Sequence, residues 1–226
     1  MKTKGAVLES RVYNTSVTPP ASMEDCSRFE NNGVFTAISN FRLPSGLCVR
    51  EFNGTTSLID CGSGDSLASY IHPAFSMEAW VYADNDGQFD EGRIFSKATG
   101  YELWIDSETG AGCLIECTID HATDANAITS DRLTVATWHY VAMVYNRLGT
   151  NHAEIYLDGA LCTLGTDTAG VGVRTDDTAT TLYIGNNAAT NRTFDGKMVY
   201  WRIYSYALTA ADIYAHYQDK RGWFGV

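Results

Sequence analysis

The sequence predicts an all-β protein built as a two-sheet antiparallel β-sandwich, with one short helix near its C-terminal end. Short runs in which every second residue is apolar recur along the chain, and clusters of Gly, Asn and Asp separate them, as expected for strands joined by turns. Charged residues make up 19% of the chain, below the roughly one quarter of an average globular protein, which favours strands over charged surface helices. The clearest run has four apolar residues that predict one inward face: Phe75, Met77, Ala79 and Val81.

Strand-like runs follow one another at short intervals from residue 47 onward. The expected strands cover residues 47–52, 56–61, 75–82, 93–97, 101–106, 112–120, 137–145, 153–157, 161–164, 181–184 and 194–206. Asn53 and Gly54 form a pair typical of tight hairpin turns, so we expect the first two strands to pair with each other. Residues 209–217 alone have a helical pattern, with Thr209 as the N-cap residue and Asp212 three positions later, a variant of the capping box.

The length of 226 residues suits one large all-β domain, and a hydrophobic content of 45% is enough for one sandwich core. We divide the chain into an N-terminal arm with the first strands (1–46), the sandwich domain (47–217) and an aromatic tail (218–226). Trp223 and Phe224 in the tail would form an exposed hydrophobic patch if both were at the surface, and such patches promote association with other proteins. We therefore expect the tail to pack on its own sandwich or on another subunit, which makes these two residues candidates for assembly.

Charge and hydropathy narrow the choice of partners. A formal net charge of -11 repels phosphate backbones, so nucleic acid is a poor candidate. No apolar run reaches the roughly 18 residues of a membrane-spanning helix, so membrane insertion is not expected. The first ten residues lack the apolar segment of a secretory signal peptide. We therefore expect display on a virion or another extracellular surface by a different route, or otherwise a cytoplasmic protein.

The six cysteines are scattered, and no two have the Cys-x-x-Cys spacing. Six cysteines can pair in 15 ways, and the sequence does not choose among them. Cys113 and Cys117 lie four residues apart and so share one face of an expected strand. Buried thiols that act as small apolar residues are favoured over a zinc site.

Five short motifs occur in a fixed order along the chain. They are Phe-Asn-Gly at 52–54, Phe-Ser-Met-Glu-Ala-Trp-Val at 75–81, Trp-His-Tyr-Val-Ala at 138–142, Ile-Tyr-Leu-Asp-Gly at 155–159 and Gly-Lys-Met-Val-Tyr-Trp-Arg-Ile-Tyr at 196–204. This series resembles the laminin G-like and concanavalin A-like lectin/glucanase superfamily over about residues 47 to 217. The resemblance implies a jelly-roll sandwich. Because the family is mostly a binding scaffold, the resemblance also implies ligand recognition rather than catalysis.

The resemblance also bears on calcium. Family members often bind calcium beside the early turn, through aspartates that match Asn53 and Val199 here. Neither position is an aspartate, and calcium needs six to eight oxygen ligands. We therefore expect the domain to require no cofactor and to fold without calcium. If a cation binds elsewhere, its candidate ligands are Asp84, Asp86 and Asp90; the alternative is that these aspartates only form turns.

A second set of candidates lies on one expected strand. Regular alternation over residues 101–106 would place Glu102, Trp104 and Asp106 on the same face. An aromatic ring beside carboxylates could form a sugar-binding platform, and jelly-roll glucanases use paired carboxylates for hydrolysis. The spacing here does not match the glucanase motif, which argues against catalysis. The alternative is a solvated outer face with Trp104 half covered.

The third set is an asparagine-rich loop at residues 185–191, which contains Asn186, Asn187 and Asn191. Loops at the ends of a sandwich often carry ligand sites, and amide side chains can both donate to and accept from sugar hydroxyls. The alternative is a plain turn built from residues that tolerate the left-handed conformation.

These observations favour a non-catalytic recognition or assembly module. The first hypothesis is a surface-displayed carbohydrate- or receptor-binding jelly roll, such as a virion decoration or appendage protein. The second is a purely structural subunit that clamps neighbouring subunits with its terminal arms. The third is a concanavalin-like glycoside hydrolase. The expected partners are a glycan or cell-surface receptor and the protein subunits of a larger assembly.

Overall fold

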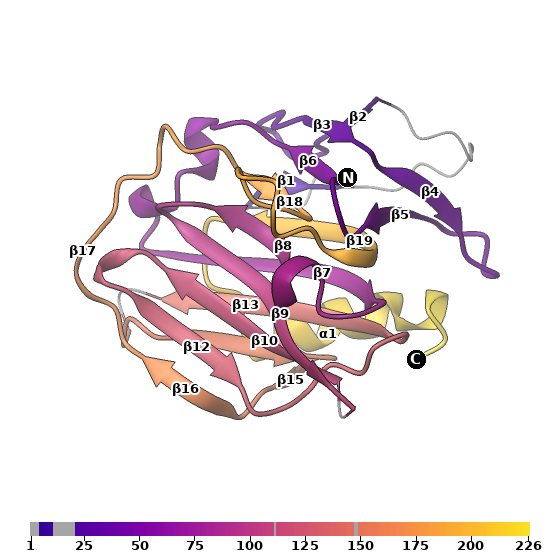
Figure 1. Cartoon of the computed structure of the whole chain (residues 1–226). Helices are drawn as coiled ribbons and strands as arrows, with labels where there is room; N and C mark the ends of the chain where they lie inside the picture. Colours follow the sequence, from indigo (N-terminus) through magenta and orange to yellow (C-terminus); the bar gives the residue numbers. More distant parts are fainter. Residues whose placement is uncertain (1–4, 11–20, 111, 147–148) are drawn as a thin grey trace.

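The protein is a sandwich of two antiparallel β-sheets. The computed structural model describes residues 5–10, 21–110, 112–146 and 149–226. Within these residues the chain forms a sheet of eight strands, here the first sheet, and a sheet of nine strands, here the second sheet, stacked face to face (Figure 1). This arrangement confirms the predicted all-β jelly-roll sandwich.

The first sheet contains the longest strands of the sandwich. In spatial order it consists of β15 (Ala160–Leu161), β14 (Ala153–Leu157), β13 (Trp138–Asn146), β7 (Ala74–Ala83), β19 (Asp195–Tyr204), β5 (Cys48–Asn53) and β4 (Ser39–Arg42), with β1 (Ala6–Glu9) also paired to β19. β7 and β19 pair over most of their length, and β13 pairs with the other edge of β7.

The second sheet packs on one face of the first. In spatial order it consists of β16 (Leu164–Thr168), β12 (Ala125–Thr129), β10 (Gly112–Ile119), β9 (Tyr101–Thr109), β8 (Glu91–Lys97), β18 (Tyr183–Ile184), β6 (Leu58–Asp60), β3 (Gly33–Thr36) and β2 (Ser22–Met23). A separate two-stranded ribbon pairs β11 (His121–Thr123) with β17 (Val171–Arg174). Short 3₁₀ turns cover Asp65–Leu67, Ser69–Ile71, Gln88–Asp90 and Arg221–Trp223.

The core between the sheets follows the alternation of the strands. All four predicted residues of β7 lie in it, fully or almost fully buried: Phe75, Met77, Ala79 and Val81. Ile155 lies in the same core. Cys113 and Cys117 lie on the core-facing side of β10, and all six cysteines are free and buried.

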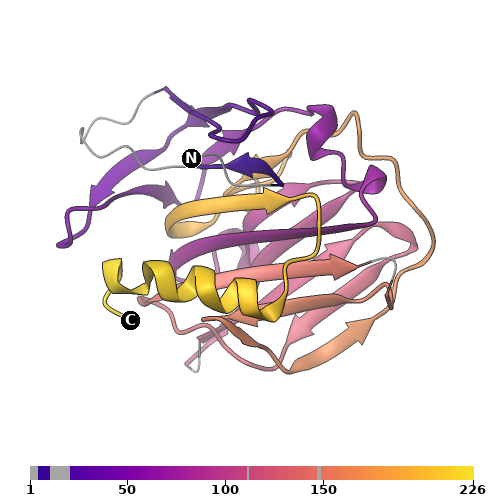
Figure 2. The ribbon, with the colours of Figure 1, turned by 180° about the vertical axis from the view of Figure 1, so that it is seen from behind.

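A third layer covers the outer face of the first sheet. Helix α1 (Ala210–Lys220) lies across this face (Figure 2). The predicted cap is present: the Thr209 side chain accepts from the Asp212 amide, and the Asp212 carboxylate bonds the Thr209 backbone. Under the helix, a second apolar cluster contains Trp80, Trp138 and Tyr140. In the part of the chain that the structure describes, no helix has the length and apolar character needed to cross a membrane.

The predicted hairpin at Asn53 and Gly54 is wrong. β5 belongs to the first sheet and β6 to the second, so the turn carries the chain from one sheet to the other. The Asn53 side chain explains this, because its Oδ1 accepts from the backbone amides of Thr55, Thr56 and Ser57 at 3.0, 2.8 and 3.0 Å. These amides are satisfied locally, and the strands on either side need no bonds to each other.

The N-terminal segment is integrated into the sandwich where it is described. β1 and β4 extend the first sheet, while β2 and β3 form the edge of the second. Residues 1–4 and 11–20 of the predicted arm lie outside the described residues. The described part of residues 1–46 therefore consists of strands that complete both sheets.

Candidate functional site

Two loops meet at one end of the sandwich and form what we call the rim. They are the β7–β8 loop, residues 84–90, and the β18–β19 loop, residues 185–194. Gln88 connects them. Its backbone amide donates to the Thr193 carbonyl at 2.9 Å, and its side-chain Oε1 accepts from the Thr193 hydroxyl at 3.0 Å. The Arg93 amide donates to the Arg192 carbonyl at 3.0 Å. The sequence-predicted Asp84–Asp90 and asparagine-rich segments are therefore neighbours in space.

Asn186 is the internal anchor of the rim. It is fully buried, and its Nδ2 donates to the Thr193 hydroxyl at 2.7 Å and to the Ser57 carbonyl at 3.3 Å. Its Oδ1 accepts from the amides of Asn187 and Arg192 at 2.8 and 3.1 Å. All of its polar groups thus hold the loop in shape, and ligand contact would have to come from its neighbours.

Asn187 and Asn191 lie at the surface of the same loop. The Asn187 Nδ2 donates to Asn191 Oδ1 at 2.9 Å, and the Asn191 amide donates to Asn187 Oδ1 at 3.1 Å. These two hydrogen bonds hold the side chains next to each other. Asn191 Nδ2 donates no hydrogen bond to the described residues. The arrangement leaves amide donors and acceptors available to hydroxyl groups of a ligand.

Phe89 is the most prominent apolar side chain of the rim. It is 68% exposed and has left-handed backbone angles, φ 55° and ψ 36°, followed by Asp90 at φ 61°. Such a conformation is a clear outlier for a bulky residue. The Arg192 guanidinium lies over the ring, 5.5 Å from its centroid. The two loops of the rim therefore place an aromatic ring and an arginine next to each other at the surface.

Ion pairs extend from the rim over the outer face of the second sheet. The Arg192 Nε lies 2.8 Å from Glu91, Glu91 lies 3.1 Å from Arg93, and the Arg93 Nε lies 3.3 Å from Glu102. Partial burial raises the pKa of Glu91, but the Arg192 hydrogen bond and the Arg93 charge outweigh burial and lower this pKa. The chain of charges keeps Glu91 ionised.

Trp104 lies under this chain of charges. Alternation places Glu102, Trp104 and Asp106 on the outer face as predicted, while their neighbours face the core. Trp104 is only 7% exposed, because the Arg93 guanidinium covers its ring at 4.2 Å. It is thus more buried than the expected half-covered ring, and a sugar could stack on that ring face only if Arg93 moved.

Glu116 is a further acidic residue of this outer face. It lies on β10 directly opposite Trp104 and within hydrogen-bond reach of Asp106 and Asn126. Burial, together with the negative charge of Asp106, raises the pKa of Glu116 to about 7. Asp106 and Glu116 therefore form a pair of carboxyl groups in which one retains its proton near neutral pH.

The three candidate cation ligands do not converge on one point. Asp84 lies 3.5 Å from the Lys197 ammonium, the Asp86 carboxylate accepts from the Glu108 amide at 2.8 Å, and Asp90 is exposed. Across the described ranges, the structure contains no group of three or more His, Cys, Asp and Glu side chains arranged to hold a metal ion.

The aromatic tail packs on its own sandwich. The Phe224 ring stacks on Trp80 with 4.2 Å between centroids and lies 4.7 Å from the Trp138 ring. Its neighbour Trp223 is 48% exposed. The two predicted assembly residues thus differ: Phe224 packs within the chain, and Trp223 remains available at the surface.

Sequence reasoning missed Phe89, Arg192 and Glu116. Glu116 could have been found, because it alternates with the apolar residues of its strand and therefore had to face outward. Phe89 and Arg192 gave no periodic signal, since both lie in loops, and their proximity follows from the contact of those loops.

The sequence of this sandwich matches a known family. The model of the concanavalin A-like lectin/glucanases superfamily matches residues 53–214, most of the chain. The chain therefore belongs to the concanavalin A-like lectin/glucanase superfamily, as its motifs predicted. No curated protein gives a sequence match.

Solved structures share the fold at low sequence identity. The binding domain of Paraclostridial Mosquitocidal Protein 1 superposes with a TM-score of 0.71 at 14% identity, covering 98% of this chain and 55% of that one. The binding domain of botulinum neurotoxin serotype G gives a TM-score of 0.66 at 15% identity, covering 95% and 51%. This chain thus spans about half the length of those domains.

A shorter structure matches over most of both chains. Domain 4 of AbnA, a GH43 extracellular arabinanase from Geobacillus stearothermophilus solved in complex with arabinotriose, gives a TM-score of 0.57 at 16% identity, covering 80% of this chain and 81% of that one. At these identities the likeness establishes the jelly-roll fold alone.

Proposed function

We propose that this chain is a non-catalytic recognition module that binds a glycan or a cell-surface receptor through its rim. The observation that carries the proposal is Phe89, an aromatic side chain held 68% exposed by a left-handed backbone. Strain of this kind persists where the surrounding structure enforces it, and it is concentrated at functional sites. Aromatic and arginine side chains are also the residues that dominate binding interfaces.

The other rim groups supply what a sugar or a polar receptor surface needs. Arg192 donates beside the Phe89 ring, and Asn187 and Asn191 offer amide groups at the surface of the adjoining loop. The loops are joined by backbone hydrogen bonds, so a ligand would meet a pre-formed surface with little ordering cost. The arabinotriose complex and the toxin binding domains among the structural neighbours support a recognition role for a module of this fold.

The test compares binding by the native chain and by Phe89→Ala on a glycan array and on whole cells. We expect Phe89→Ala to weaken binding about tenfold or more, the loss typical of an aromatic hot-spot residue that becomes buried in the complex. Phe29→Ala is the matched control, because Phe29 is also exposed, at 38%, and also carries an arginine, Arg28, over its ring at 4.6 Å. Equal binding by native protein and Phe89→Ala would refute the rim as the site.

The hydrolase hypothesis retains one specific supporting observation. The pKa of the Glu116 carboxyl group is raised to about 7, as a general acid requires. Release of reducing sugar from neutral polysaccharides by the native chain, lost in Glu116→Gln, would support hydrolysis. Binding without release would support the recognition module.

The assembly hypothesis concerns the tail and the setting. Exposure of Trp223 supports a contact with another subunit, and Trp223→Ala would then lower the mass of the particle in solution. Display on a virion, as a decoration or appendage protein, is our hypothesis for the setting. Capsid genes beside this gene would support it, and polysaccharide-degrading genes would oppose it.

A further inference from the structure

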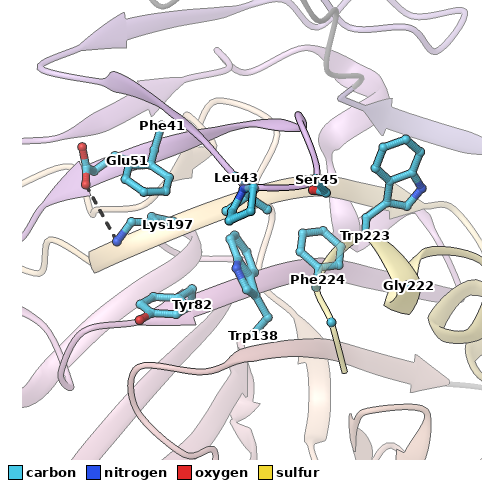
Figure 3. A pocket seen from close by; sticks show the side chains of 12 residues that line it. Phe41, Leu43, Ser45, Glu51, Tyr82, Trp138, Lys197, Gly222, Trp223 and Phe224 are labelled. Atoms are coloured by element: carbon cyan, nitrogen blue, oxygen red, sulfur yellow. Dashed lines mark ion pairs between the residues drawn. The ribbon is translucent and has the colours of Figure 1, made fainter.

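A pocket on the outer face of the first sheet has the features of a second ligand site. It has a volume of about 590 Å³, within the range of small-molecule sites. It opens between the β4–β5 turn and the aromatic tail, and it shares no lining residue with the rim. Figure 3 shows Lys197 and Glu51 at one end of the pocket and Trp223 at the other.

The floor of the pocket follows from strand register. Lys197 on β19 pairs with Glu51 on β5 and with Tyr82 on β7, and Tyr82 pairs with Trp138 on β13. Because paired residues of adjacent strands point to the same face, these four side chains form one continuous row. A charged pair and two aromatic rings are thereby fixed side by side on rigid strands rather than on loops.

The walls are aromatic and differ in how tightly they pack on the rest of the chain. Phe224 is held by stacking on the buried Trp80, 4.2 Å between centroids, so this wall is firm. Phe41 and Trp223 are 40% and 48% exposed and lie on the β4 and tail sides of the opening. Exposed ring faces on two sides of a pocket suit a flat ligand with C–H groups on both of its faces.

Lys197 has hydrogen-bonding capacity left for a ligand. Its side chain is only 12% exposed, yet its ion pairs are long, 3.5 Å to Asp84 and 3.8 Å to Glu51. Its ammonium also lies against the Tyr82 and Phe41 rings, 4.7 and 5.3 Å from their centroids. An ammonium has three donors, and contacts of this length leave them weakly satisfied.

The balance of charge favours a neutral ligand. The pocket lining carries one carboxylate, Glu51, and one ammonium, Lys197, so neither an added anion nor an added cation would meet net charge of the opposite sign there. A neutral ring with hydroxyl groups could accept from Lys197 and donate to Glu51 while stacking between the aromatic walls. We propose that this pocket binds a neutral sugar ring, independently of the rim.

The test starts from an array of neutral oligosaccharides and continues by calorimetry with the best neutral binder and with trigalacturonic acid as the anionic comparison. We expect saturable binding of the neutral sugar with a shift in tryptophan emission. Trp223→Ala and Lys197→Met should each weaken it about tenfold or more, the loss expected for one stacking or charged contact. Tyr214→Ala, a residue 56% exposed on the helix and outside the pocket, should leave it unchanged.

The outcomes separate this proposal from the rim. Neutral sugar binding that Phe89→Ala removes and Trp223→Ala leaves intact would overturn the pocket and uphold the rim, and the reverse pattern would uphold the pocket alone. Three further outcomes would overturn the pocket proposal. The array could contain no neutral binder, or trigalacturonic acid could bind more tightly than the neutral sugar. Trp223→Ala could also act only by dissociating a dimer. Unfolding curves of each variant show whether a loss of binding reflects loss of the fold.

Discussion

The Glu78 carboxylate accepts a hydrogen bond of 2.8 Å from the His216 imidazole, and this contact joins β7 to the helix that covers it. Glu78 is fully buried. It also accepts from Arg202 at 2.8 Å, from the Tyr140 hydroxyl at 2.6 Å and from the Tyr204 hydroxyl at 3.1 Å. One carboxylate thus bonds side chains from two neighbouring strands and from α1, and it fixes the third layer that leads into the tail.

We expect Glu78→Gln to lower the free energy of unfolding by about 3 kcal/mol, the lower end for a broken buried ion pair, because the mostly buried Arg202 loses its nearest carboxylate and keeps only the longer contact of 3.6 Å to Glu9. Urea unfolding measures the change, with Glu108→Gln as the control at an exposed glutamate. Burial raises the pKa of Glu78, but the His216 and Arg202 interactions outweigh burial and lower it. The ionised Glu78 carboxylate therefore stabilises the fold above about pH 4.5, and this stabilisation is lost as the pH falls further and the carboxylate takes up a proton. An acid transition that is identical in native protein and Glu78→Gln would contradict this role.

The fold could be predicted where one strand face is apolar and the other polar. The alternation in β7 and β9 gave their core residues directly. β12 was missed, because Ala125–Thr129 contains few strong strand formers. The register of the sheets is non-local, so the cover that Arg93 on β8 provides over Trp104 on β9 could not be read from either strand alone.

The candidate sites depend more strongly on such non-local contacts. The asparagine loop was predicted as a surface feature, but its contact with residues 84–90 arises from hydrogen bonds between segments about 100 residues apart. The exposure of Phe89 depends on a left-handed backbone conformation. This conformation could not be predicted from the sequence, because phenylalanine rarely adopts it. The pocket likewise requires residues from five strands and the tail.

Glu116 should make stability depend on pH in the opposite sense to Glu78. Its pKa is raised to about 7 by burial and by Asp106, whereas an unfolded glutamate titrates near 4.3. Between these values the folded state binds more protons, so the free energy of unfolding should fall as the pH rises from about 4.5 to about 7. We expect Glu116→Gln to be more stable than the native chain at about pH 8. Unfolding in urea at several pH values checks this, and an unchanged pH profile would refute the raised pKa.

Phe89→Gly should raise stability while it removes the proposed rim contact. Glycine adopts the left-handed conformation without the penalty of about 1 kcal/mol that other residues incur there. The exposed ring buries little apolar surface, so its loss costs little. We expect the free energy of unfolding to rise by up to about 1 kcal/mol in urea unfolding. A clear loss of stability would show that Phe89 has a structural role that the exposed ring conceals.

Calcium should not change the stability of the chain. The family aspartates are replaced by Asn53 and Val199, and Asn53 already uses its side-chain oxygen to bond backbone amides of its own turn. A ligand that binds only the folded state must raise the melting temperature. We therefore expect the same melting curve in millimolar calcium and in a chelator. A rise of several degrees in calcium would show that other oxygen ligands rebuild a site.

Phe224→Ala should destabilise the domain, and Trp223→Ala should not. The Phe224 ring stacks on Trp80 and Trp138 in the cluster beneath the helix, so its removal opens a cavity on the first sheet. Because Phe224 is partly exposed, we expect a loss of about 2 kcal/mol, below the value for a fully buried phenylalanine. Trp223 is 48% exposed, and its removal should change stability by less than about 0.5 kcal/mol. Urea unfolding gives both values, and mass measurement in solution separates folding from assembly. Equal losses in the two variants would mean that both rings pack on the sandwich, whereas a lower mass of Trp223→Ala with unchanged stability would place Trp223 in a contact between subunits.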